Sequence, residues 1–174
     1  MKKIDKSLYT NNKFFDNLSL IEKIKYLEEI LRKTVNTGIF KKRELNWVSD
    51  VFDKDSILNT YGNLKKLSEN KIIGKNTTIC CFNLMPFLGC CGIALFHNFI
   101  IDDKYRNLGI GELIVTLVEL LSQYQGYTII VCTDVIKNKP MKKILENRGW
   151  QSAFNFINVR TENNVELSYK NLLL

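Results

Sequence analysis

The feature that most restricts the fold is a long segment without charge. From Thr77 to Ile101 no residue carries a full charge, and a helix of this length would span a bilayer. Residues that suit strands and turns better than a lipid-facing helix are spread through it: Asn83, Pro86, Gly89, Gly92, His97 and Asn98. We therefore predict consecutive antiparallel strands over 77–83, 89–96 and 97–101, and no membrane segment.

Helical periodicity precedes this segment. Ser19 and Glu22 form a capping box, and apolar residues then recur at helical spacing through about Val35. A second helical region, in two pieces, is predicted over 45–67. The first half of the chain is therefore expected to be largely helical.

Helices and strands alternate after Gly109. A broad apolar stripe predicts a helix that ends at Gly126, and a buried strand should follow over 127–133. A short helix from Pro140 and two final strands, 150–159 and 165–169, complete the order. This order predicts an α+β fold in which helices flank a mixed, mostly antiparallel sheet.

Length and charge restrict the function more loosely. The chain has 174 residues, enough for one domain, and its 45% apolar content argues against extended disorder. Its net charge of +7 favours a negatively charged partner, such as a phosphate-rich cofactor, an acidic protein surface or RNA. The chain opens on polar sequence instead of the apolar run of a signal peptide, so we expect a cytoplasmic protein.

The cysteines fit no common framework. Their number is odd, and their spacing matches neither a disulfide scaffold nor a paired zinc motif: Cys80, Cys81, Cys90, Cys91 and Cys132. Neighbouring side chains in a strand point to opposite faces, which makes joint metal binding unfavourable. We predict reduced, buried strand residues and no metal site.

The segment from Ile101 to Glu112 has the features of an anion site. It runs from a predicted strand through a turn into a helix, whose N-terminus presents unpaired amides and a positive dipole end. Gly109 and Gly111 let an anion approach the main chain, and Arg106 can bond a phosphate in two places. The segment lacks the Gly-Lys-Ser/Thr of a Walker loop and the third glycine of a dinucleotide fingerprint.

Arg106-x-x-Gly109-x-Gly111 resembles the cofactor motif of the GCN5-related N-acetyltransferases (GNAT). Asn138 before a short helix that ends in Gly149-Trp150 resembles a second feature of that family. The resemblance covers about residues 77–169. It implies the acyl-CoA N-acyltransferase fold in one domain, 1–174, with a helical acceptor-side half over 1–75 and an acetyl-CoA-binding half over 76–174.

The resemblance also implies a cofactor site for acetyl-CoA as cosubstrate. Amides near the start of the helix would hold the diphosphate, and the pantetheine arm would pair with the strand edge before the motif. The implied binding residues are Phe99, Ile101, Arg106, Asn107, Leu108, Gly109, Ile110, Gly111, Glu112 and Asn138.

His97 is the candidate general base. Attack on a thioester requires a neutral amine, and imidazole titrates near neutrality. Strand alternation predicts that His97 shares a face with Phe99 and Ile101. A core histidine is the alternative. The chain departs from the family at Leu145, where many members have a tyrosine general acid, so Cys132, Tyr169, water or no donor at all remains open.

Two functions follow as hypotheses. The first is transfer of an acetyl group from acetyl-CoA to a primary amine; the second is a catalytically weak acyl-CoA-binding or regulatory protein on the same scaffold, which the leucine at 145 motivates. The acceptor is not readable from the sequence. A small molecule, a peptide, an aminoacyl-tRNA or another nucleic acid stays open, as does a homodimer.

Overall fold

One mixed sheet organises the protein. The computed structural model describes residues 3–35, 69–73, 78–87 and 89–173. The predicted helical region over 45–67 lies outside the described residues. The sheet order is β1-β2-β3-β4-β6-β5, where β3 and β4 run parallel and the other neighbours antiparallel. The strands are β1 (Glu69–Ile73), β2 (Thr78–Pro86), β3 (Ile93–Ile101), β4 (Ile129–Val135), β5 (Gln151–Ile157) and β6 (Asn164–Asn171).

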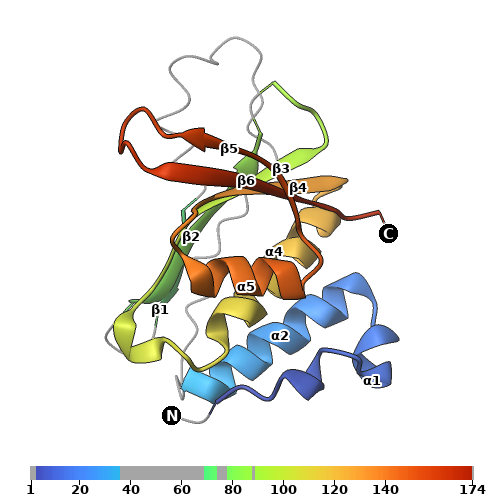
Figure 1. Ribbon diagram of the computed structural model, residues 1–174. Coiled ribbons are helices and arrows are strands. Elements are labelled where there is room, and N and C mark those ends of the chain that lie inside the picture. The colour runs from blue at the N-terminus through green and yellow to red at the C-terminus, as the bar shows by residue number, and fades with distance from the viewer. Residues whose placement is uncertain (1–2, 36–68, 74–77, 88, 174) are drawn as a thin grey trace.

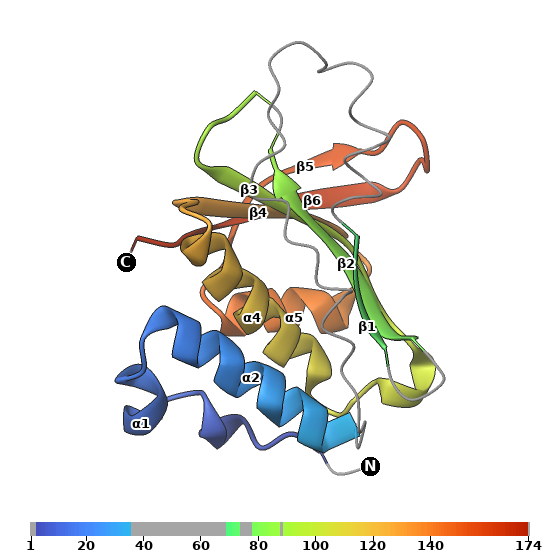
Figure 2. The ribbon, with the colours of Figure 1, turned by 180° about the vertical axis from the view of Figure 1, so that it is seen from behind.

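The described helices gather on one face of the sheet (Figures 1 and 2). The longer ones are α2 (Leu20–Val35), α4 (Ile110–Tyr124) and α5 (Lys139–Asn147), and the short ones are η1 (Lys6–Leu8), α1 (Lys13–Asp16) and η3 (Asp103–Tyr105). The predictions for the three longer helices are confirmed. None of the helices in the described part of the chain has the length and apolar character needed to span a bilayer.

The start of α2 carries the predicted capping box. The Ser19 amide donates to Glu22 Oε2 at 2.9 Å, and the Glu22 amide donates to Ser19 Oγ at 3.4 Å. Each side chain thus satisfies a backbone donor that the first turn leaves without an intrahelical partner. The apolar face of α2, which includes Leu27 and Leu31, is buried and packs against α4.

The centre of the molecule is α4, which is buried on almost every side. Its apolar residues meet the sheet, α2 and α5. It also buries an acid, Glu119, which is 4% exposed. Glu119 accepts hydrogen bonds from Arg148 at 2.6 Å, Lys170 at 2.8 Å and the Trp150 indole at 2.8 Å. This network ties α4 to the end of α5 and to β6.

A bulge in β3 changes which side chains share a face. The ladder pairs Asn83 with His97 and Cys81 with Ile100, so two residues of β3 stand opposite Phe82. Asn98 takes a φ of +52° there. As a result the rings of Phe96 and Phe99 lie on the same face, 5.4 Å apart.

Two predictions about β3 are corrected. Residues 97–101 do not form a separate strand, because β3 runs through them without a break. His97 follows Phe96 directly in the strand and therefore faces away from Phe99 and Ile101, so the predicted shared face is wrong. Strand alternation gave the wrong face because the bulge at Asn98 inserts one extra residue between His97 and Phe99.

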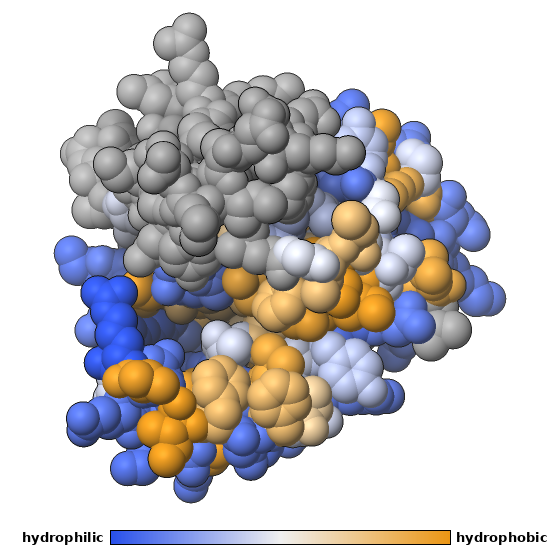
Figure 3. All heavy atoms as spheres, turned by 90° about the horizontal axis from the view of Figure 1, so that it is seen from above, coloured by the Kyte–Doolittle hydropathy of each residue, from blue (hydrophilic) through white to orange (hydrophobic). Residues whose placement is uncertain are grey.

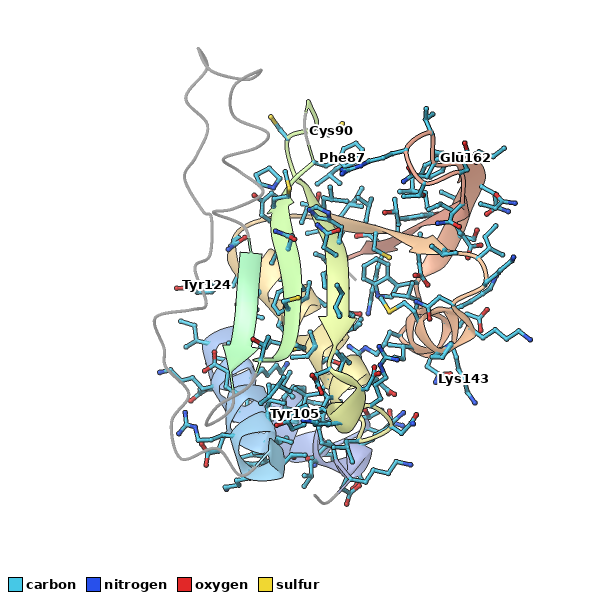
Figure 4. The ribbon with its side chains drawn as sticks, turned by 90° about the vertical axis from the view of Figure 1, so that its left-hand side faces the viewer. Phe87, Cys90, Tyr105, Tyr124, Lys143 and Glu162 are labelled. Carbon is cyan, nitrogen blue, oxygen red and sulfur yellow. The ribbon has the colours of Figure 1, made fainter. Side chains whose placement is uncertain are left out.

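The cysteine prediction holds in part. Cys80 and Cys132 are buried in strands, but Cys90 and Cys91 are exposed in the turn between β2 and β3. Figure 4 shows Cys90 and Phe87 at the tip of this turn. A charge-free run does not distinguish turn from strand, which explains the error. Within the described ranges no group of three or more cysteine, histidine or acidic side chains could hold a metal ion.

The outer strand β5 contributes little to the core. All seven of its residues are exposed, including Phe154, Phe156 and Ile157. The two phenylalanine rings lie 6.0 Å apart and shield each other in part. Figure 3 shows hydrophobic side chains reaching the surface on the side seen from above. The buried apolar residues of the sheet come mainly from β2, β3 and β4.

Candidate functional site

The site begins where β3 and β4 separate. Their parallel ladder joins 93–96 to 129–132 and ends at the pair Phe96 and Cys132. Beyond it β4 continues against β6 to Val135. The edge of β3 beyond Phe96 has no strand partner on that side within the described residues. A ligand can therefore reach main-chain groups of both strands.

A cavity of about 690 Å³ occupies this region. Its volume falls in the range of small-molecule and cofactor sites. Figure 4 shows Tyr105 below the end of β3 and Lys143 on α5, and both side chains line the cavity. The cavity contacts most of the sequence-predicted residues, namely His97, Phe99, Ile101, Arg106, Asn107, Gly109, Gly111, Glu112 and Asn138.

The N-terminus of α4 forms one end of the cavity. Gly109 is the N-cap residue with a φ of +84°, and among the described residues no side chain caps the first turn. The first amides of α4 are therefore available to an anion. Space is tight at both glycines: a Cβ at Gly109 would lie 3.2 Å from Ile4 Cβ, and one at Gly111 would lie 3.0 Å from the flexible end of Ile144, at Cδ1.

Arg106 is held beside this helix end. Its Nε donates to the Ile101 carbonyl at 3.2 Å, and its Nη2 lies 2.7 Å from Asp103 Oδ1. The Arg106 side chain is 59% exposed, so water screens the ion pair with Asp103. The guanidinium can therefore exchange this carboxylate for a phosphate.

Glu112 brings a negative charge into the same end of the cavity. Its side chain is 9% exposed and forms an ion pair with the ammonium of Lys6. Lys3 and Lys6 both line the cavity, and sequence reasoning missed both. The partners Lys6 and Glu112 are 106 positions apart, and no local pattern links them.

Asn138 joins α5 to the end of β4. Its Oδ1 accepts from the Met141 amide at 3.4 Å, and its Nδ2 donates to Asp134 Oδ1 at 2.9 Å. Burial raises the pKa of Asp134, while this hydrogen bond acts in the opposite direction. Asn138 thus positions α5 along the cavity, and its predicted contact with the cofactor stays a prediction.

The opposite end of the cavity holds His97 and Cys132. His97 is half-buried there. Burial raises the pKa of the Cys132 thiol, so Cys132 keeps its proton and is a weak acid. Tyr169 lines neither cavity, and its hydroxyl donates to Gln151.

Leu145 lies outside this cavity. It is 4% exposed and faces a smaller cavity of about 140 Å³ beneath α5. Trp150 and Glu166 line the same small cavity. The side chain at position 145, where many GNAT proteins have a tyrosine, therefore supplies no hydroxyl.

Sequence comparisons give no match, either with models of protein families or with curated proteins. Solved structures do match. Ard1 from Thermoplasma volcanium is 12% identical, with a TM-score of 0.57 over 82% of this chain and 93% of its own. A GNAT family acetyltransferase from Elizabethkingia anophelis, with acetyl-CoA bound, is 15% identical, with a TM-score of 0.54 over 63% of this chain and 80% of its own.

A third match is shorter. A protein from Bacillus anthracis, assigned as a streptothricin acetyltransferase and solved in complex with acetyl coenzyme A, is 16% identical, with a TM-score of 0.50. The match spans 59% of this chain and 62% of that protein. At such identities the comparisons establish the fold. The chain has the acyl-CoA N-acyltransferase (GNAT) fold, which confirms the predicted fold class.

Proposed function

We propose that this protein belongs to the GNAT family and transfers an acetyl group from acetyl-CoA to a primary amine. The observation that carries the proposal is the cavity at the separation of β3 and β4, which extends from the uncapped N-terminus of α4 to His97. A long ligand with phosphates at one end and a thioester at the other fits this arrangement. Structural neighbours solved with acetyl coenzyme A bound support the choice of ligand.

Different residues along the cavity would contact the diphosphate, the pantetheine arm and the thioester of acetyl-CoA. The amides of Ile110 to Glu112 and the guanidinium of Arg106 would hold the diphosphate. The edge of β3 at Phe99 and Ile101 would pair with the pantetheine arm as an added strand does. His97 would stand near the thioester, because among the β3 residues that line the cavity only Phe96 lies farther from the α4 loop.

The reaction needs a neutral amine at the thioester carbon. The nitrogen lone pair forms the new C–N bond, the C–S bond breaks, and its electrons leave with the thiolate. One proton of the amine passes to His97, directly or through water. Neither Cys132 nor Tyr169 suits the protonation of the thiolate, so we propose that it takes its proton from solvent.

A second candidate function rests on Leu145. A leucine at this position, together with a Cys132 thiol whose pKa is raised, leaves the departing thiolate without a protein acid. An acyl-CoA-binding or regulatory protein with slow turnover would have this arrangement. Both candidates require acetyl-CoA to bind, and turnover separates them.

The test is a titration followed by a turnover assay. Calorimetry should detect binding of acetyl-CoA, and release of free thiol should follow on mixing with an amine. Neighbours of this fold include a ribosomal-protein-S18-alanine N-acetyltransferase and a spermidine N-acetyltransferase, so the amines should include peptide N-termini and polyamines. Binding without turnover for any amine would favour the second candidate, and absence of binding would refute both.

Arg106→Ala is expected to weaken acetyl-CoA binding by about 1 to 3 kcal/mol, because a charge-assisted contact to phosphate is lost. Calorimetric titration of the variant measures this change. Arg160→Ala, in the exposed turn between β5 and β6, is the matched control and should bind as the parent protein does. Equal affinity of the Arg106 variant and this control would contradict the assignment.

His97→Ala is expected to lower kcat/KM about a hundredfold near neutral pH, with little change in acetyl-CoA affinity. The deficit should shrink as the pH rises toward the pKa of the acceptor amine, because the amine then needs no base. Steady-state rates across a pH series give the measurement. A deficit that stays constant over the series would point to a structural role for His97.

A further inference from the structure

The chain segment over residues 3–9, called here the amino-terminal arm, lies across the loop that begins α4. The Ile4 amide donates to the Leu108 carbonyl at 2.9 Å. Tyr9 is 3% exposed and packs in the core, with its ring centroid 6.5 Å from that of Phe15. The arm is thus fixed at both ends, and Figure 1 shows it in dark blue beside the N label.

Two lysines of the arm, Lys3 and Lys6, line the cavity. Lys3 is exposed, and the Lys6 side chain is 45% exposed. The Lys6 ammonium forms an ion pair with Glu112, the third residue of α4. Arg106 and Lys143 add two more positive charges to the cavity wall. Positive groups therefore outnumber the two acids, Glu112 and Asp134, on that wall.

The position of Glu112 is unfavourable for an anionic ligand. A carboxylate in the first turn of a helix is stabilised by the positive dipole end. A diphosphate bound to the same amides would be repelled by this carboxylate. Lys6 offsets the repulsion by pairing with Glu112, and its exposed half leaves it able to turn toward a ligand.

We infer that the amino-terminal arm is part of the diphosphate site, with Lys6 and Lys3 as ligand-binding residues and Glu112 as the counter-ion that holds Lys6 until the ligand binds. This inference rests on the proposed function. When acetyl-CoA enters, Lys6 divides its hydrogen bonds between Glu112 and a phosphate. The arm thereby extends the site beyond the strand–turn–helix segment that the sequence motif covers.

The inference predicts that substitutions of the two partners of one ion pair change acetyl-CoA affinity in opposite directions. Lys6→Met should weaken acetyl-CoA binding about tenfold, the usual size for one charge-assisted contact. Glu112→Gln keeps the shape of the side chain, removes the repulsion and releases Lys6, so it should tighten binding severalfold. A purely structural ion pair would give two variants with lower melting temperatures and unchanged affinity.

The experiment is calorimetry of the whole chain with two probes, acetyl-CoA and S-acetylpantetheine, which lacks the phosphates. Lys6→Met and Lys3→Met should each weaken acetyl-CoA binding and leave S-acetylpantetheine binding unchanged. Lys13→Met, on the exposed side of α1, is the matched control and should change neither. Lys3 is exposed, so its variant tests the arm even if the Lys6 variant folds poorly.

The outcomes distinguish failure of this inference from failure of the proposed function on which it rests. If the parent protein binds no acetyl-CoA, the proposed function fails. If the parent binds and the Lys6 and Lys3 variants bind equally well, the function stands and the role of the arm is refuted. Weakening of acetyl-CoA binding by Glu112→Gln to the same degree as by Lys6→Met would also overturn the inference.

Discussion

Glu119→Ala is expected to lower the free energy of unfolding by about 3 to 5 kcal/mol, the range found when one partner of a buried ion pair is removed. The carboxylate is 5% exposed and accepts from Arg148, Lys170 and Trp150. Without it two partly buried cations, whose side chains are 20% and 23% exposed, and the buried Trp150 indole N–H lose their acceptor. Urea denaturation of the parent and the variant measures the difference.

The chain offers a control in another glutamate. Glu29 on α2 pairs with Arg32 at 3.1 Å and Lys33 at 3.6 Å, but its side chain is 43% exposed. Glu29→Ala should change the free energy of unfolding by less than about 1 kcal/mol, because water screens exposed pairs. Similar losses for the two variants would show that the network at Glu119 adds nothing beyond a surface pair.

Gly109→Val should lower the free energy of unfolding by about 3 kcal/mol, since a β-branched residue in the left-handed region is strained by about 1 to 3 kcal/mol before any clash is counted. Gly109 has a φ of +84°, and an added Cβ would stand 3.2 Å from Ile4 Cβ. The valine would push the amino-terminal arm away from α4 and turn the first amides. Under the proposed function, acetyl-CoA affinity should fall at least tenfold as well.

Gly126 provides a control that separates backbone strain from the steric contact of the added side chain. It has the same φ of +84° at the other end of α4, yet an added Cβ there meets nothing within 4 Å. Gly126→Val should therefore show the backbone strain alone and leave acetyl-CoA binding intact. Denaturation and calorimetry of both variants give the comparison. Equal effects of the two valines on stability and on binding would contradict a specific role for the Gly109 loop.

The helices were predictable because their signals are local. The capping box of Ser19 and Glu22 and the apolar stripe after Gly109 lie within a few residues of the structure they specify. Short apolar strands were harder to predict. The charge-free run contained β2 and β3, but β2 ends at Pro86 and β3 begins at Ile93, so Cys90 and Cys91 lie between the two strands and are exposed.

The loop that precedes α4 in the candidate site was predictable from the sequence, but the orientation of the β3 side chains beside it was not. The motif at Arg106, Gly109 and Gly111 leads to the cavity, and the structure places those residues along its wall. The bulge at Asn98 was not visible, because nothing in a strand pattern marks where one residue is inserted. It turned His97 away from Phe99, against the prediction from strand alternation.

The sequence by itself determined the helix caps, the helical faces and the turn that opens α4, since each depends on neighbours within one or two turns of chain. The tertiary structure alone decided which charges meet. Lys6 reaches Glu112 across 106 positions, and Lys170 reaches Glu119 across 51. Such pairs form only after the sheet and helices have packed, because burial excludes water and makes a distant opposite charge the available partner.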